Sequence, residues 1–221
     1  MRILISGGIG IGKSTFCDRL NKEFGYPIHK TGRHANNIEH FSFGLRQSFM
    51  ELLSLEAMFD TKYHNCVLDR WLIDFLMWQY EDESFNVGEL LDRIALDAID
   101  KDSDVFLVSP NPPLNFYLDN INDFRGDYIR WSAFSDKYIA YLREKYNGDT
   151  PHHILDTEVL SFIKDWTDNL IDFTVSWLKM NELNYIYVEL SDVGDLNWRQ
   201  VWQDAYMDRL RSVINETGRV D

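Results

Sequence analysis

The chain of 221 residues has few cysteines and no long apolar run. Its two cysteines, Cys17 and Cys66, form no CxxC pair and no Cys/His cluster, so we expect neither a disulfide framework nor a zinc site. Apolar runs such as residues 105–108 are far shorter than the ~18 residues of a membrane span, and no basic segment precedes an apolar signal sequence. We therefore expect a soluble, unprocessed, cytoplasmic protein without a membrane partner.

Basic residues are also scarce. The chain has 22 Lys and Arg against 36 Asp and Glu, a formal net charge of −14. Because binding to duplex nucleic acid normally depends on a basic surface, this charge argues against a nucleic-acid partner without excluding a local groove. The charge is uneven, since residues 1–50 hold seven basic and three acidic residues, and residues 81–127 hold three and twelve. An anionic ligand is therefore expected near the N-terminal segment.

Repeats, low-complexity tracts and Pro/Gly/Ser linkers are missing as well. A chain of this length can bury one substantial core, so we expect a single domain over residues 1–221. Four tryptophans recur on apolar helix faces and are expected in that core rather than against a ligand: Trp166, Trp177, Trp198 and Trp202.

Strands and helices are predicted to alternate along the chain. Short apolar segments predict strands over residues 2–6, 26–30, 65–69, 104–109 and 185–190. Helical spacing of apolar residues predicts helices over residues 15–24, 40–62, 71–80, 86–101, 130–146, 158–180 and 197–214. Such alternation predicts an α/β fold whose parallel sheet is covered by helices on both faces.

A glycine-rich loop connects the first strand to the first helix. Residues 7–14 read Gly-Gly-Ile-Gly-Ile-Gly-Lys-Ser and match G-x-x-x-x-G-K-[ST] in full, which disfavours a turn that binds nothing. In such loops backbone N–H groups and the helix N-terminus bind phosphate. We expect Lys13 to reach the β and γ phosphates of ATP and Ser14 to coordinate Mg²⁺. The full set of candidate ATP-binding residues is Gly7, Gly8, Ile9, Gly10, Ile11, Gly12, Lys13, Ser14 and Thr15.

A second motif, Asp69-Arg70-Trp71, follows the predicted strand at residues 65–69. Ligands bind at the carboxyl edge of open parallel sheets, which is where this strand ends. The carboxylate of Asp69 could hold Mg²⁺ through water or accept a proton from an attacking hydroxyl, and the guanidinium of Arg70 could bind a phosphate bidentately. An ion pair that caps the strand is the structural alternative.

The phosphate loop, Asp69-Arg70-Trp71 and Gln79 together resemble the thymidylate kinase and deoxynucleoside kinase group of P-loop kinases. The resemblance covers about residues 1–135 by motif. It implies an α/β, P-loop NTPase-type, five-stranded parallel sheet with helices on both faces and a helical lid at about residues 111–156. It also implies ATP and Mg²⁺ as cofactors and a small-molecule nucleotide as substrate.

The same resemblance suggests which residues bind the acceptor. Arg33 stands where those enzymes face the substrate phosphate, and Trp71, which replaces a usual Tyr, His or Ser, would crowd the acceptor or stack against it. The start of helix 40–62 would line the base pocket, although its aromatic residues could equally belong to the core. The candidate substrate-binding residues are Arg33, Phe43, Arg46, Gln47, Arg70, Trp71 and Gln79.

The catalytic candidates are Lys13, Asp69 and two arginines of the expected lid. The phosphate loop contains no arginine, so positive charge on the transferred group must come from another segment. Arg125 and Arg130 lie where related kinases carry lid arginines, in a polar segment with the character of a closing loop. Their alternative role is a solvated or ion-paired surface position.

ATP-dependent phosphorylation of a deoxynucleoside monophosphate is the favoured function, because Arg33, Arg46 and Arg70 supply three cations for an acceptor phosphate. A deoxynucleoside kinase that acts on a 5′-hydroxyl is the close alternative, and a kinase of a hydroxymethylated base in DNA is a third. From another class, the chain could be a non-kinase ATPase module or a nucleotide switch, but it has no guanine-reading N-K-x-D. The accepted base and sugar and a possible homodimer are left open.

Overall fold

The computed structural model describes residues 1–8, 10–30, 43–75, 88–119, 152–189 and 198–217. Strands and helices alternate along these residues, as the sequence predicts. In chain order they are β1 (Arg2–Ser6), α1 (Lys13–Phe24), β2 (Ile28–Lys30), α2 (Phe43–Asp60), β3 (Cys66–Asp69), α4 (Gly88–Asp97), β4 (Val105–Val108), α5 (Leu114–Asp119), α8 (His152–Met180), β5 (Tyr185–Ile186) and α9 (Trp198–Thr217).

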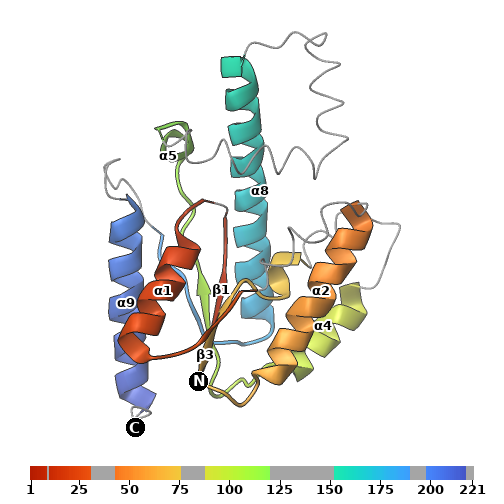
Figure 1. The fold of residues 1–221 in the computed structure, drawn as a ribbon, viewed down its shortest axis with the longest axis vertical. Coiled ribbons are helices and arrows are strands. Elements are labelled where there is room, and N and C mark those ends of the chain that lie inside the picture. The colour runs from red at the N-terminus through yellow and green to blue at the C-terminus, as the bar shows by residue number, and fades with distance from the viewer. Residues whose placement is uncertain (9, 31–42, 76–87, 120–151, 190–197, 218–221) are drawn as a thin grey trace.

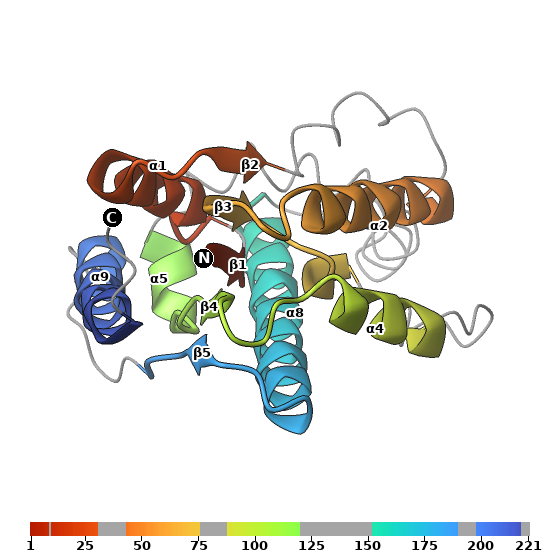
Figure 2. The ribbon, with the colours of Figure 1, turned by 90° about the horizontal axis from the view of Figure 1, so that it is seen from below.

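The five strands form one parallel sheet in the order β2-β3-β1-β4-β5. Helices α1 and α9 cover one face, and α2, α4 and α8 cover the other (Figures 1 and 2). The central strand β1 pairs with β3 so that Ile5 lies opposite Asp69, and with β4 so that Ser6 lies opposite Val108. This arrangement confirms the expected P-loop NTPase-type fold.

The alternation of side chains along the strands divides the core in two. Ile3 and Ile5 pack with residues of α1 and α9, whereas Leu4 packs on the opposite face with residues of α2, α4 and α8. Rings dominate the first side, where the Phe16 and Trp202 centroids lie 5.0 Å apart. The four tryptophans that the helical spacing assigns to the core, Trp166, Trp177, Trp198 and Trp202, are all buried, which confirms that prediction.

Several element bounds differ from the predicted ones. The last strand is limited to Tyr185–Ile186, because it lies at the sheet edge and pairs only with Phe106 and Leu107 of β4. Helix α8 begins at His152, six residues before the expected start, and the short helix α5 was not predicted. Among the described residues, no helix combines the length and apolarity that a membrane span requires.

Other predicted elements lie wholly or partly outside the described residues. Of the helix expected over residues 71–80, the structure describes residues 71–75, and 73–75 are helical. The helix expected over residues 130–146 and most of the lid expected at 111–156 lie outside the described residues.

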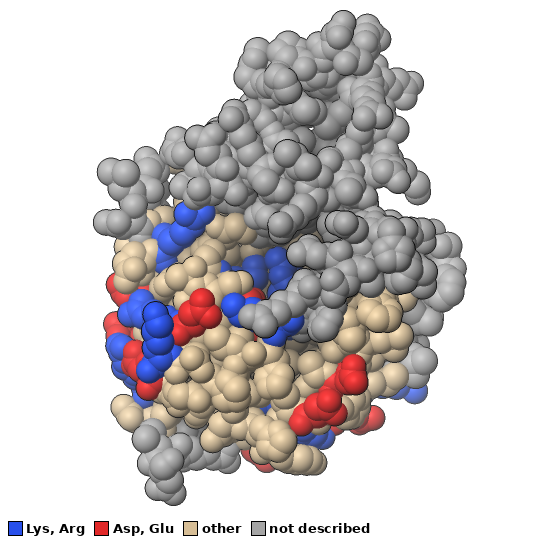
Figure 3. Space-filling view, in the orientation of Figure 1, with Lys and Arg blue, Asp and Glu red and all other residues tan. Residues whose placement is uncertain are grey.

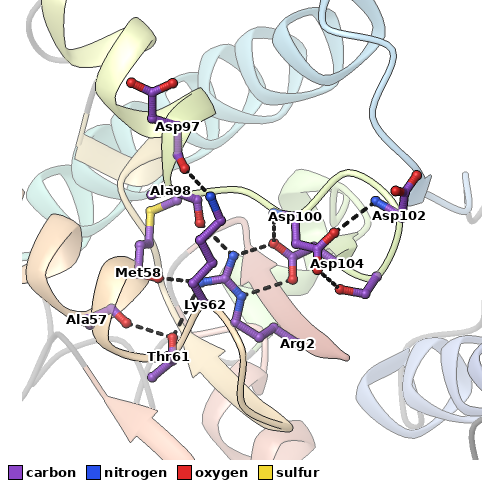
Figure 4. Close-up of polar contacts among 11 residues, drawn as sticks. Arg2, Ala57, Met58, Thr61, Lys62, Asp97, Ala98, Asp100, Asp102 and Asp104 are labelled. Atoms are coloured by element: carbon purple, nitrogen blue, oxygen red, sulfur yellow. Dashed lines mark hydrogen bonds and ion pairs between the residues drawn. The ribbon is translucent and has the colours of Figure 1, made fainter.

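A buried arginine connects several elements at the amino-terminal end of the sheet (Figure 4). Arg2, at the start of β1, donates two hydrogen bonds to the carboxylate of Asp104, one of them 2.9 Å long from Nε. It also donates to the carbonyl of Ala98 at 2.7 Å and to the carbonyl of Met58. Both Arg2 and Asp104 are almost fully buried, so the guanidinium joins the start of β1 to the residue before β4, the last turn of α2 and the residue after α4.

We predict that Arg2→Met lowers the free energy of unfolding by about 3–5 kcal/mol, because Asp104 is left as an uncompensated buried charge. Chemical denaturation measures this change. The double variant Arg2→Met/Asp104→Leu should be destabilised less than the single variant. Arg211→Met, which breaks an exposed ion pair with Glu23, is the matched control and should have a much smaller effect. A single variant as stable as the wild type would contradict this account.

Candidate active site

The phosphate loop leaves β1 at Gly7 and enters α1 at Lys13. Its backbone is held close to neighbouring elements, since a Cβ on Gly7 would lie 1.7 Å from the Oγ of Ser109, just after β4. Gly7 also has a φ of 129°, so both its conformation and its surroundings require glycine. The structure therefore places the loop where the motif predicts it, between the central strand and the first helix.

Lys13 lies inside this loop. Its Nζ donates to the carbonyl of Gly7 at 2.7 Å and to the carbonyl of Gly8. Burial lowers its pKa from 10.5 to about 7, and the nearby charge of Arg70 acts in the same direction, against the carboxylates of Asp74 and Asp69. A bound anion would favour the charged form of this lysine, and the charged ammonium is the form that binds phosphate.

Ser14 and Asp69 meet at the carboxyl edge of the sheet. The Oγ of Ser14 donates to Oδ2 of Asp69 at 2.7 Å, although the residues are 55 positions apart. A hydroxyl and a carboxylate are oxygen ligands of the kind that Mg²⁺ prefers, and Mg²⁺ usually takes few protein ligands beside substrate phosphates. Within the described part of the chain, no group of three or more His, Cys, Asp or Glu could hold a metal. The pair therefore fits Mg²⁺ that is shared with a nucleotide.

Asp74 is a site residue that the sequence motifs do not predict. Its buried carboxylate accepts hydrogen bonds from the Ser6 hydroxyl at 2.8 Å and from the backbone N–H groups of Gly7 and Trp71, each at 3.3 Å. Burial raises its pKa above 3.8, although the charges of Arg70 and Lys13 oppose this shift. Asp74 thus joins the start of the phosphate loop to the segment after β3. The signal in the sequence is an acid within the apolar segment of residues 71–78.

Arg70 lies beside the phosphate loop. It has a φ of 69°, which is uncommon for a residue other than glycine and is found at strained functional positions. Its N–H donates to the carbonyl of Ile5 at 3.1 Å, and its charge affects the pKa of Lys13 and Asp74. In the space-filling view, some Lys and Arg side chains lie near the middle of the molecule and others lie at its left side among Asp and Glu, on a surface made mostly of other residues (Figure 3).

Trp71 does not have the position that its expected role requires. Its side chain is only 1% exposed, and its ring centroid lies 4.9 Å from that of Phe106 and 5.8 Å from that of Trp177. The indole therefore fills the core between the sheet and α8. We correct the assignment of Trp71 as a substrate-binding residue, because its ring faces are covered by other side chains.

The remaining candidate site residues fall into two groups, those that the structure describes and those that lie outside the described residues. The backbone of Phe43, Arg46 and Gln47 lies in the first turns of α2. The loop residues Gly7, Gly8, Gly10, Ile11, Gly12, Lys13, Ser14 and Thr15 are described, and Ile11 is fully buried. The positions Ile9, Arg33, Gln79, Arg125 and Arg130 lie outside the described residues.

Comparison with known proteins gives a likeness of fold. No protein-family model matches the chain, and no curated protein matches it. The structure of deoxyadenosine kinase from M. mycoides with bound dATP is 16% identical, with a TM-score of 0.52, and the match covers 96% of this chain and 100% of that one. The YorR protein from Bacillus subtilis, in complex with phosphorylated GDP, is 17% identical with a TM-score of 0.49 over 96% and 98% of the two chains.

The fold and the loop therefore define a protein with the P-loop NTPase-type architecture. Among solved structures, this chain shares that fold over nearly its whole length with deoxyadenosine kinase from M. mycoides.

We predict that Lys13→Met lowers kcat for phosphoryl transfer by about 10²–10³, because a preorganised positive charge near the transferred phosphate is lost. The variant should remain folded with a cooperative thermal transition, although the carbonyls of Gly7 and Gly8 lose the Lys13 donor. Steady-state kinetics and calorimetry measure the two quantities. Lys22→Met, at an exposed position of the same helix, is the control. Normal turnover of a folded Lys13→Met protein would remove Lys13 from the mechanism.

A second prediction concerns the metal. Mg²⁺ should tighten ATP binding to the wild type, and Asp69→Asn should weaken the apparent affinity for Mg²⁺ about 10- to 100-fold, because the carboxylate charge is lost. Isothermal titration of ATP at several Mg²⁺ concentrations measures this effect. Asp18→Asn, on the exposed side of α1, is the matched control. An unchanged Mg²⁺ dependence in Asp69→Asn would show that Asp69 does not share the metal.

Proposed function

We propose that the protein is an ATP-dependent kinase that transfers a phosphoryl group to a deoxynucleoside monophosphate. The observation that carries this proposal is the convergence of Lys13, the Ser14–Asp69 pair and Arg70 at one edge of the sheet. Phosphoryl transfer depends on positioning and on stabilisation of negative charge, and these residues supply both. The expected lid arginines Arg125 and Arg130 would add positive charge to the transferred group.

The site residues that the structure describes each have a role in the proposed reaction. Backbone N–H groups of the loop and the ammonium of Lys13 bind the phosphates of ATP. Ser14 and Asp69 would hold Mg²⁺, which neutralises phosphate charge when it is bound. Asp74 holds the segment that carries Arg70 against the start of the loop through its bonds to Gly7 and Trp71.

Arg70 supports a phosphorylated acceptor. A guanidinium binds a phosphate bidentately, and Arg70 directly follows Asp69 and is close enough to Lys13 for its charge to lower the pKa of that lysine. The motif Asp69-Arg70 also resembles thymidylate kinases more closely than nucleoside kinases. A deoxynucleoside is the second candidate acceptor. The similarity of fold to deoxyadenosine kinase over nearly the whole chain favours this alternative.

A panel assay of ADP release separates these acceptors. Deoxynucleosides, their monophosphates and hydroxymethylated DNA are each added to the wild-type protein with ATP and Mg²⁺. Turnover with a monophosphate and none with the matched nucleoside is the expected result. Turnover with the nucleoside only would favour the second candidate, and ATP hydrolysis that no acceptor stimulates would overturn the kinase proposal.

We further predict that Arg70→Lys raises the KM for the monophosphate at least tenfold, because the charge is kept while one of two bidentate hydrogen bonds is lost. The affinity for ATP should change little. Arginine and lysine have the same conformational cost at a positive φ, so the comparison tests the guanidinium group alone. Arg93→Lys, at an exposed position of α4, is the control. An unchanged acceptor KM would show that Arg70 does not bind the acceptor phosphate.

A further inference from the structure

Three side chains of α9 donate hydrogen bonds to three consecutive carbonyls of the phosphate loop. Arg199 donates to the carbonyl of Gly10 from Nη2 at 3.0 Å and from Nε at 3.3 Å. The indole N–H of Trp202 donates to the carbonyl of Ile11 at 3.0 Å. Nε2 of Gln203 donates to the carbonyl of Gly12 at 3.2 Å.

Contacts with α1 and α5 hold helix α9, and therefore these donors, in place. It lies alongside α1 (Figures 1 and 2). The Trp202 ring packs against Phe16 with centroids 5.0 Å apart, and Arg19 of α1 forms an ion pair with Asp204 at 2.5 Å. The Arg199 guanidinium also lies 5.3 Å from the centroid of the Phe116 ring. The donors therefore belong to a helix that is packed against both α1 and α5.

The hydrogen bonds to these carbonyls also determine where the N–H groups of the same peptide units point. A trans peptide unit is planar, and its C=O and its N–H point in opposite directions. Because the carbonyls of Gly10, Ile11 and Gly12 point toward these donors, the N–H groups of the next residues, Ile11, Gly12 and Lys13, point away from α9. The carbonyl of Gly12 is shared, since it also accepts from the N–H of Phe16 in α1 at 3.0 Å. Backbone N–H groups at these loop positions are the ones that bind phosphate in this motif.

Gly12 shows how closely α9 approaches the loop. Its φ is 92°, and a Cβ at this position would lie 3.2 Å from Nε2 of Gln203 and 3.7 Å from Cδ of Arg199. The loop therefore contacts α9 through its backbone, and the contact leaves little room for the peptide units to rotate.

We propose that Arg199, Trp202 and Gln203 are positioning residues for the phosphates of ATP. They orient three loop N–H groups before the nucleotide binds, and so reduce the ordering that binding must impose. This inference rests on the proposed function, and it assigns part of the phosphate site to a helix that the sequence motif does not include.

Gln203 gives the sharpest test, because it is uncharged. Gln203→Met keeps the side-chain length and removes the donor, and it should raise the Kd for ATP and for inorganic tripolyphosphate about two- to tenfold, the range of one hydrogen bond. The matched control is Gln200→Met, in the same helix, because Gln200 is exposed and bonds only to Asp204 among the described contacts. Isothermal titration well below the melting temperature measures each Kd.

The outcomes of this experiment separate positioning from simple packing. A higher Kd for both probes in Gln203→Met and an unchanged Kd in Gln200→Met support the proposal. A lower melting temperature with an unchanged Kd would overturn it, because Gln203 would then only stabilise the fold. A wild-type protein that binds neither probe would instead overturn the proposed function, so the two failures can be distinguished.

Arg199 gives an independent test in which charge must be separated from position. Arg199→Met should raise the Kd for ATP, and Arg199→Lys, which keeps a donor, should restore part of the affinity. Long-range attraction is screened by salt, whereas the orientation of the loop is not. The loss should therefore persist at 0.5 M NaCl, a salt level at which the Debye length is about 4–5 Å. A loss that disappears at this salt concentration would overturn the assignment of Arg199.

Discussion

The parallel pairing of β1 with β3 is the constraint on which the rest of the site depends. Ile5 lies opposite Asp69, and the N–H of Arg70 extends the pairing by donating to the carbonyl of Ile5. This register places the Asp69 carboxylate on the face of the sheet that α1 covers, within 2.7 Å of the Ser14 hydroxyl. A slip of one residue would turn the side chain of Asp69 to the opposite face and leave Ser14 without its carboxylate partner.

Much of the architecture could be predicted from the sequence because it follows from local patterns. The strand at residues 2–6, the loop at residues 7–14 and the helix after it are specified by neighbouring residues: a β-branched run, glycines at fixed spacing and a helical apolar stripe. The parallel sheet follows from the alternation of strands and helices. The meeting of Ser14 with Asp69 follows in turn from parallel strands that end at one edge.

The features that were missed depend on contacts between distant segments. Trp71 is part of the core because Phe106 and Trp177 converge on its ring, and nothing in residues 69–71 indicates that convergence. Asp74 gains its role only when the turn after β3 brings it beneath Ser6 and Gly7. The donors of α9 cannot be recognised from a periodic pattern, because Arg199, Trp202 and Gln203 are ordinary residues for an amphipathic helix.

The contacts between α9 and the phosphate loop have a consequence for the order in which the protein is made. They join residues 189 to 191 positions apart in the chain. Synthesis proceeds from the N-terminus at about 5–20 residues per second, so the loop leaves the ribosome roughly ten seconds or more before the donors that hold its carbonyls. During that interval water must satisfy the carbonyls of Gly10 and Ile11, whereas the carbonyl of Gly12 can already accept from the N–H of Phe16 in α1. If these contacts position the loop as proposed, the full affinity for a nucleotide would be reached only after α9 has docked, later than the glycine loop emerges.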